Sequence, residues 1–227
     1  MARTEFRRAV ETRDGSVLAV APRLEAHAAK LEQLPAERRV IDAEGAARAL
    51  RNAQQLYALD GLVLGGDGRL IEREAVPFAL DVLDRLRRVL ADRCALSLAL
   101  PTPALLRCQL GLEADDAENR LVEIVTEVGR AEPDGLLLVG PLPDPSAIDA
   151  PARLAEHFGI ALVPIGDDDE DNDLSGIVRL RDHAGQPPAP PPGTWLVTTR
   201  GEVPADTDPA LFRAVLASLR EQTPAAA

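Results

Sequence analysis

Asp60-Gly-Leu-Val-Leu-Gly-Gly66 and Asp134-Gly-Leu-Leu-Leu-Val-Gly140 nearly repeat each other, and each follows an amphipathic segment with helical periodicity. An unbroken apolar run in this position is typical of a parallel strand that helices cover on both faces, because neither face meets solvent. The sequence therefore predicts an α/β fold. In such folds ligands bind at the carboxyl ends of the strands, so we expect the site there.

Five further runs of apolar or β-branched residues extend this pattern along the chain. Strands are predicted at 16–21, 60–66, 95–100, 134–140, 159–165, 177–181 and 194–199. Helices are predicted at 42–58, 75–92, 115–131, 148–158 and 208–221. Asp42, Asp115 and Asp208 are predicted helix caps, because an aspartate side chain accepts from the free amides of a first turn.

The length of 227 residues suits one domain, and we predict that residues 1–227 form it. The acidic run at 166–176 and the proline-rich run at 185–193 are predicted to be exposed loops. The later strands follow one another closely, so the pattern predicts a shortened or incomplete (β/α) barrel. The alternative is an open doubly wound parallel sheet. No Gly-x-Gly-x-x-Gly follows the first strand, which argues against the usual dinucleotide-binding fold.

Composition excludes several classes of partner. The formal net charge is -12, which predicts repulsion from nucleic acid. Cys94 and Cys108 are the only cysteines, and no apolar leader or long apolar stretch is present, so we expect a cytoplasmic protein that neither spans nor binds a membrane. Both thiols are expected to be buried or half-buried. Aromatic residues make up 3% of the chain, so the core is expected to be aliphatic.

Three segments resemble the superfamily of uroporphyrinogen decarboxylases and of corrinoid and cobalamin-independent methyltransferases, and they appear in the same order as in that superfamily. The segment from Val40 to Leu64 resembles the family's helix and second strand, which ends in an Asp-Gly-hydrophobic run. Val89 to Leu106 resembles the third strand, with Pro-Thr in place of the usual Gly-Pro, and Gly193 to Pro209 resembles the closing strand with its Val-Pro loop. The resemblance implies a diverged, shortened member built as a (β/α)8 barrel.

The resemblance also implies which groups are kept and which are lost. The decarboxylases carry an Asp seven residues beyond the one that opens strand two, and here that position is Asp67. Their Arg-rich motif after strand one is reduced here to Arg23. Their closing His-Gly is Arg200-Gly201 here, and the zinc-binding Cys of the methyltransferases is Gly201. We therefore expect no metal and no cofactor.

Charged and polar residues near the predicted strand ends remain as candidates for the site. Asp67 is predicted to orient the ligand and Arg200 to contact its anionic group, and both are the candidate catalytic residues. The further candidate ligand contacts are Arg23, Arg69, Thr102, Asp144 and Glu202. Alternatively, Asp67 belongs to an ordinary Gly-Asp-Gly turn, and Asp67 with Arg200 forms a rim salt bridge. The three histidines, His27, His157 and His183, are interpreted as surface or capping residues.

Three hypotheses of function follow, and the sequence leaves open whether the chain is an enzyme. The first is a metal-free lyase or group transferase that acts on a small acidic or tetrapyrrole-like ligand. The second is a catalytically silent binding or assembly protein, which a partner or a second copy completes, since an incomplete barrel would leave apolar surface uncovered. The third is an accessory protein of a corrinoid methyl-transfer system. Because an incomplete barrel should associate, a homo-oligomer or a heteromer is expected.

Overall fold

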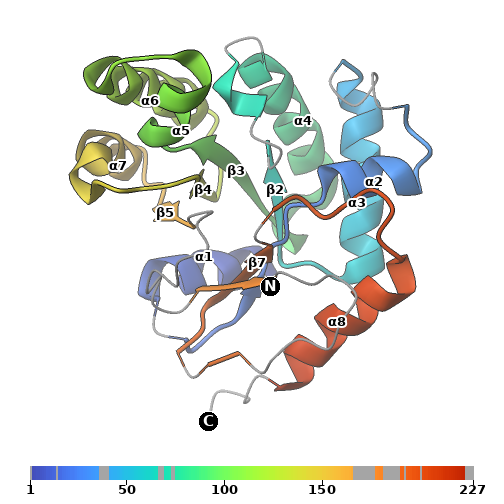
Figure 1. The fold of residues 1–227 in the computed structure, drawn as a ribbon. Helices are drawn as coiled ribbons and strands as arrows, with labels where there is room; N and C mark the ends of the chain where they lie inside the picture. Colours follow the sequence, from blue (N-terminus) through green and yellow to red (C-terminus); the bar gives the residue numbers. More distant parts are fainter. Residues whose placement is uncertain are drawn as a thin grey trace.

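The computed structural model describes residues 2–13, 15–35, 41–65, 69–72, 75–165, 177–180, 190–191, 193–199 and 201–222. These residues form an α/β fold with parallel sheets (Figure 1). The strands are β1 (Ala19–Val20), β2 (Gly61–Leu64), β3 (Ala95–Pro101), β4 (Gly135–Val139), β5 (Leu162–Pro164), β6 (Ile177–Leu180) and β7 (Leu196–Thr199). Each lies within one of the predicted strand ranges or overlaps it almost completely, although β1 and β5 begin three residues later than predicted, so all seven strands are confirmed.

Eight α-helices lie in the described part of the chain. They are α1 (Ala2–Thr12), α2 (Glu25–Leu31), α3 (Ala43–Tyr57), α4 (Ala75–Leu90), α5 (Pro103–Leu110), α6 (Ala114–Gly129), α7 (Asp149–His157) and α8 (Pro209–Gln222). Short 3-10 turns lie at η2 (Arg69–Ile71), η3 (Ala91–Arg93) and η4 (Pro145–Ile148). The five predicted helices are confirmed, whereas α1, α2 and α5 were not predicted.

Two of the three predicted helix caps are confirmed. The Asp42 side chain accepts from the Gly45 amide at 2.8 Å, and Asp208 accepts from the Ala210 amide at 2.7 Å. The prediction for Asp115 is wrong, because α6 begins at Ala114 and this aspartate lies inside its first turn. Its charge still faces the positive end of the helix dipole there.

The strands pair in parallel in the orders β1-β7-β6 and β2-β3-β4-β5. The first sheet adjoins the second where β1 meets the start of β2. There the Asp60 amide donates to the Val20 carbonyl oxygen at 3.2 Å, and the Val20 amide donates to Asp60 Oδ2 at 3.0 Å. Both bonds link the ends of neighbouring strands, so β1 lies beside β2 as well as β7.

The strands have an apolar core on each face. Leucines on one face, such as Leu62, Leu98 and Leu136, pack against the helices α3 to α7, which follow one another along the β2–β5 sheet in Figure 1. The other face is shared by both sheets and is built mostly from small residues. The unbroken apolar runs are therefore explained by burial on both sides.

Helix α1 covers the small-residue face near the strands' amino ends. Phe6 is fully buried there with Ala9 and Val10. A Cβ atom at Gly61 would lie 2.9 Å from the Phe6 ring, so glycine at the start of β2 makes room for this side chain. The core is aliphatic apart from a few rings, as its composition predicted.

Candidate functional site

The carboxyl ends of β1 and β7 meet at Arg23. Arg23 is only 2% exposed, which is unusual for a residue that carries a guanidinium. The Arg23 amide donates to Thr199 Oγ1 at 3.1 Å, and its Nη2 donates to the Thr199 carbonyl oxygen at 3.2 Å. The Val203 amide donates to the Arg23 carbonyl oxygen at 2.7 Å. The chain at the end of β7 and beyond it thus holds this arginine through three hydrogen bonds.

Further polar groups surround this junction. Thr198 and Thr199 are fully buried, and Thr198 Oγ1 donates to the Ala21 carbonyl oxygen at 2.9 Å. Glu202 Oε1 accepts from the amide of Ala26 in the first turn of α2. Arg23 and Glu202, both predicted from the sequence as ligand contacts, therefore lie near the same junction of β1, β7 and α2; their contact with a ligand stays a prediction. The two threonines were not predicted, although Thr-Thr at the end of an apolar run was a visible signal.

Thr102 and Asp144 have capping contacts in the structure. Thr102 is buried, and its Oγ1 accepts from the Leu105 amide at 3.3 Å at the start of α5. Asp144 is exposed and accepts from both the amide and the hydroxyl of Ser146, at 2.9 and 2.7 Å. These two bonds hold the pKa of the Asp144 carboxyl below its ordinary value. Both residues follow strand ends, as predicted, and their contact with a ligand stays a prediction.

The predicted catalytic pair and one predicted contact lie beyond what the structure describes. Asp67 and Arg200 are outside the described residues, and so are the predicted loops at 166–176 and most of 185–193. The backbone of Arg69 forms part of η2, but its side chain is outside the described part. The ion pair between Asp67 and Arg200 therefore stays a prediction.

His27 corrects the interpretation of the histidines. It is 1% exposed, and its Nε2 lies 2.6 Å from the Tyr57 hydroxyl oxygen. Both rings pack edge-on against Phe212 of α8, and they are tilted relative to each other. Burial raises the pKa of Tyr57 to about 12. His27 is therefore a core residue of the α2–α3–α8 layer, and the prediction of a surface or capping role is wrong.

The two thiols differ from each other. Cys94 is buried as expected, and burial raises the pKa of its thiol to about 12. Cys108 on α5 is exposed, so the expectation of burial is wrong for this residue. Within the described residues, no group of three or more His, Cys, Asp or Glu side chains is placed to hold a metal ion.

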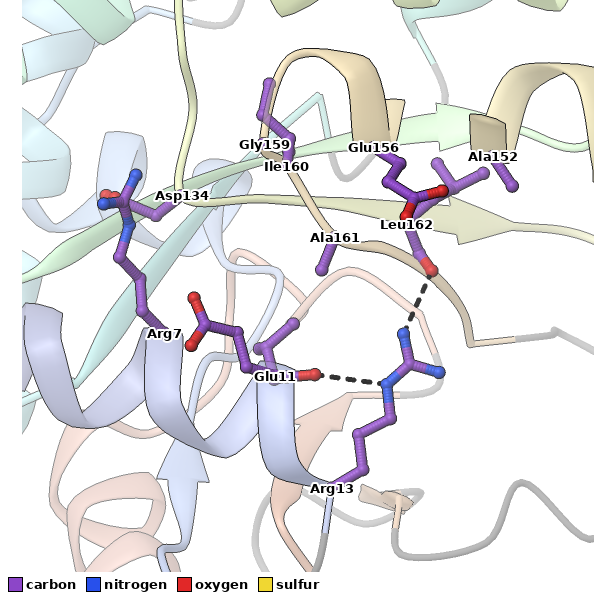
Figure 2. A pocket seen from close by; sticks show the side chains of 11 residues that line it. Arg7, Glu11, Arg13, Asp134, Ala152, Glu156, Gly159, Ile160, Ala161 and Leu162 are labelled. Atoms are coloured by element: carbon purple, nitrogen blue, oxygen red, sulfur yellow. Dashed lines mark hydrogen bonds and ion pairs between the residues drawn. The ribbon is translucent and has the colours of Figure 1, made fainter. Parts of the chain in front are cut away.

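A pocket lies at the opposite, amino-terminal end of the strands (Figure 2). This pocket has a volume of about 460 Å³ and lies between α1, α7 and the turn that leads into β5. Arg7 and Arg13 of the α1 segment line it, together with Glu11 of the same helix and Glu156 of α7. The sequence did not indicate this pocket, because its walls come from segments almost 150 residues apart, as with Arg13 and Leu162.

Comparisons with known proteins add no relative: no protein-family model, no curated protein and no solved structure matches the chain. None of the helices in the described ranges is long and apolar enough to cross a membrane.

Proposed function

We propose that this chain is a shortened (β/α) barrel that resembles the uroporphyrinogen decarboxylases and binds a small acidic ligand at the carboxyl ends of its strands. The strand order supports a barrel. Joined through Asp60 and Val20, the two sheets give the order β6-β7-β1-β2-β3-β4-β5, in which β1 to β5 lie in sequence order and β7 lies between β6 and β1. Barrels have this order, whereas a doubly wound sheet reverses direction at a switch point.

The two cores also favour a barrel. Side chains of β1 and β7 (Ala19, Leu196) share one cluster with those of β2 to β5 (Val63, Leu137, Val163). In a barrel such a cluster is the interior, and the leucine-rich face is the layer under the helices. The small residues of this interior leave room for α1 to cover one end of the proposed barrel.

Arg23 is the observation that carries the functional part of the proposal. Its guanidinium is buried at the carboxyl end of β1 and fixed by the Thr199 carbonyl oxygen. A positioned guanidinium is suited to a carboxylate, because its fork of donors matches the two oxygens. In a low-dielectric site this attraction is stronger than at the surface.

For the reaction, we favour a metal-free lyase over group transfer. In a decarboxylation, the bond between the carboxylate carbon and its neighbour breaks, carbon dioxide leaves, and a proton takes its place on the neighbouring carbon. Asp67 is the group that we propose to orient the ligand for this proton transfer, and Arg200 is a second anion contact. Both assignments rest on the resemblance of this sequence to the uroporphyrinogen decarboxylases at positions 67 and 200.

Calorimetric titration with a series of mono-, di- and tricarboxylates tests the site. At least one acid is expected to bind, and Arg23→Gln is expected to weaken it at least about ten-fold, as the loss of a charge-assisted pair predicts. Arg153→Gln, at an exposed position of α7, is the matched control. Arg23→Lys keeps the charge and shows whether the fork itself matters. If no acid binds, or if Arg23→Gln binds as the wild type does in a folded state, the proposal is wrong.

A second candidate is an assembly protein without catalysis. Within the described residues, β5 pairs only with β4, and β6 pairs only with β7. Strand edges of this kind are used for pairing with another chain. Light scattering coupled to size exclusion tests it: a dimer or larger species at micromolar concentration supports this function, and a monomer contradicts it.

A further inference from the structure

The pocket at the amino-terminal end of the strands has the features of a ligand site, and it is separate from the Arg23 site. Its floor is apolar and consists of Val10, Ile160 and Leu162, all at most 9% exposed. Its volume of about 460 Å³ lies in the range of small-molecule sites. An apolar floor with a few charged groups at the walls is the usual composition of such a site.

Two carboxylates face this space from opposite walls. Glu11 extends from α1, and Glu156 extends from α7 (Figure 2). Neither forms a hydrogen bond or an ion pair with any residue that the structure describes. A cationic group of a ligand would therefore meet a carboxylate that is not already neutralised.

The two arginines differ in how much of their charge is available. Arg7 Nε lies 2.8 Å from Asp134 Oδ1, a buried carboxylate oxygen that Arg3 Nε also contacts at 2.8 Å, so Arg7 already has a carboxylate partner. Arg13 instead donates from Nε to the Val10 carbonyl oxygen at 3.1 Å and from Nη2 to the Leu162 carbonyl oxygen at 3.3 Å. Its guanidinium also lies 5.7 Å from the centre of the Trp195 ring. These contacts fix the group but leave its positive charge without a carboxylate among the described residues.

The Arg13 guanidinium and the Glu156 carboxylate line the same pocket. Figure 2 shows the Glu156 carboxylate and the Arg13 guanidinium on either side of the Leu162 carbonyl group. No ion pair forms between these two described side chains, so each is available to a ligand group of opposite charge. A ligand with both charges can contact both side chains at once, whereas a ligand with one charge can use only one of them.

We propose that this pocket binds a small zwitterion with an apolar body, which is the chemistry of a free amino acid with an aliphatic side chain. The ammonium contacts Glu156, with Glu11 on the facing wall. The carboxylate contacts Arg13, and the side chain covers Val10 and Ile160. Arg7 and Asp134 are already paired and form the end wall.

Isothermal titration of the full chain with L-leucine, N-acetyl-L-leucine, L-leucinamide and glycine tests this. Leucine is expected to bind at least about ten-fold more tightly than the two derivatives, since each lacks one charge, and more tightly than glycine, which lacks the apolar body. The derivatives also separate a free amino acid from a residue inside a peptide, whose ammonium and carboxylate are both blocked.

Variants assign the two contacts. Glu156→Gln is expected to weaken leucine and leucinamide but not N-acetylleucine, and Arg13→Gln is expected to have the opposite selectivity. Glu127→Gln and Arg107→Gln, at exposed positions of α6 and α5, are the matched controls. Because Arg13→Gln also removes contacts to β5, Glu156→Gln is the decisive variant. Absence of leucine binding at millimolar concentration, or equal binding of leucine and N-acetylleucine, overturns the proposal and leaves the Arg23 site untouched.

Discussion

Asp134 pairs with Leu96 through both its backbone and its side chain. The Asp134 amide donates to the Leu96 carbonyl oxygen at 2.7 Å, and the Leu96 amide donates to Asp134 Oδ2 at 2.9 Å. The other oxygen, Oδ1, lies 2.8 Å from Nε of both Arg3 and Arg7. One carboxylate thus joins β4 to β3 and holds α1 across the amino ends of the strands.

Asp134→Ala is expected to destabilise the fold by about 3 kcal/mol. The substitution leaves the buried Leu96 amide without an acceptor and removes the anion between Arg3 and Arg7. Asp134→Asn keeps an acceptor for the amide and is expected to cost roughly half as much. Urea denaturation followed by circular dichroism measures both, and equal stability of Asp134→Ala and the wild type would show that the carboxylate has no structural role.

Asp60 forms the same two hydrogen bonds with Val20 that Asp134 forms with Leu96, but burial dominates the pKa of its carboxyl. Burial raises the pKa of the Asp60 carboxyl above its ordinary value, and Arg220, 3.7 Å away, and the Val20 amide only partly offset this effect. A carboxyl with a raised folded-state pKa adds stability below its unfolded pKa, and this contribution is lost as pH rises through the folded value. Asp60→Asn keeps the acceptor, so its stability relative to the wild type is expected to be highest at neutral pH and to fall toward pH 4.

Urea midpoints of wild type, Asp60→Asn and Asp60→Ala at both pH values measure this difference. Asp60→Ala is the control, because it also removes the acceptor for the Val20 amide and is expected to cost about 1–3 kcal/mol at either pH. An advantage of Asp60→Asn that grows on acidification would mean that folding lowers the pKa of the Asp60 carboxyl, the opposite of the expected direction.

Burial on both faces made the strands predictable. An apolar run such as Leu136 to Val139 has no solvent side, so its sequence alone identifies it. Helix α5 was missed because Pro101-Thr102-Pro103 was assigned only to the segment that resembles the family's third strand. In fact Thr102 caps the helix and Pro103 begins it, a start signal that the sequence did contain.

The sites were predictable only in part. Glu202 was predicted by the rule that sites lie at the carboxyl ends of parallel strands, whereas Arg23 was predicted from the family resemblance, and the structure places both near one junction. The pocket between α1 and α7 could not be found in this way, because it depends on how α1 lies across the sheet. Arg13 and Glu156 belong to segments with no shared motif, and only packing brings them together.

Thiol reactivity is expected to distinguish the two cysteines. Cys108 is exposed, whereas Cys94 is fully buried with a thiol pKa of about 12, so it offers almost no thiolate to a reagent at neutral pH. Titration with a disulfide reagent is expected to detect one thiol in the native protein and both in urea. Cys108→Ser is expected to abolish the native signal, and a fast reaction of this variant would contradict the burial of Cys94.

The single tyrosine makes the His27–Tyr57 contact directly measurable. Its pKa of about 12 predicts that tyrosinate absorbance stays low in the folded protein at pH 10.5, whereas unfolding in urea at this pH releases a normal phenol. Because the folded-state pKa is raised above the unfolded value, stability is expected to decline as pH rises from 10 toward 12. Tyr57→Phe removes this decline and is expected to cost about 1–2 kcal/mol at pH 7, since His27 Nε2 loses its buried partner. Ultraviolet titration and urea denaturation measure the two effects, and a phenol that ionises near pH 10 in the folded chain would place Tyr57 in solvent and contradict the buried α2–α3–α8 layer.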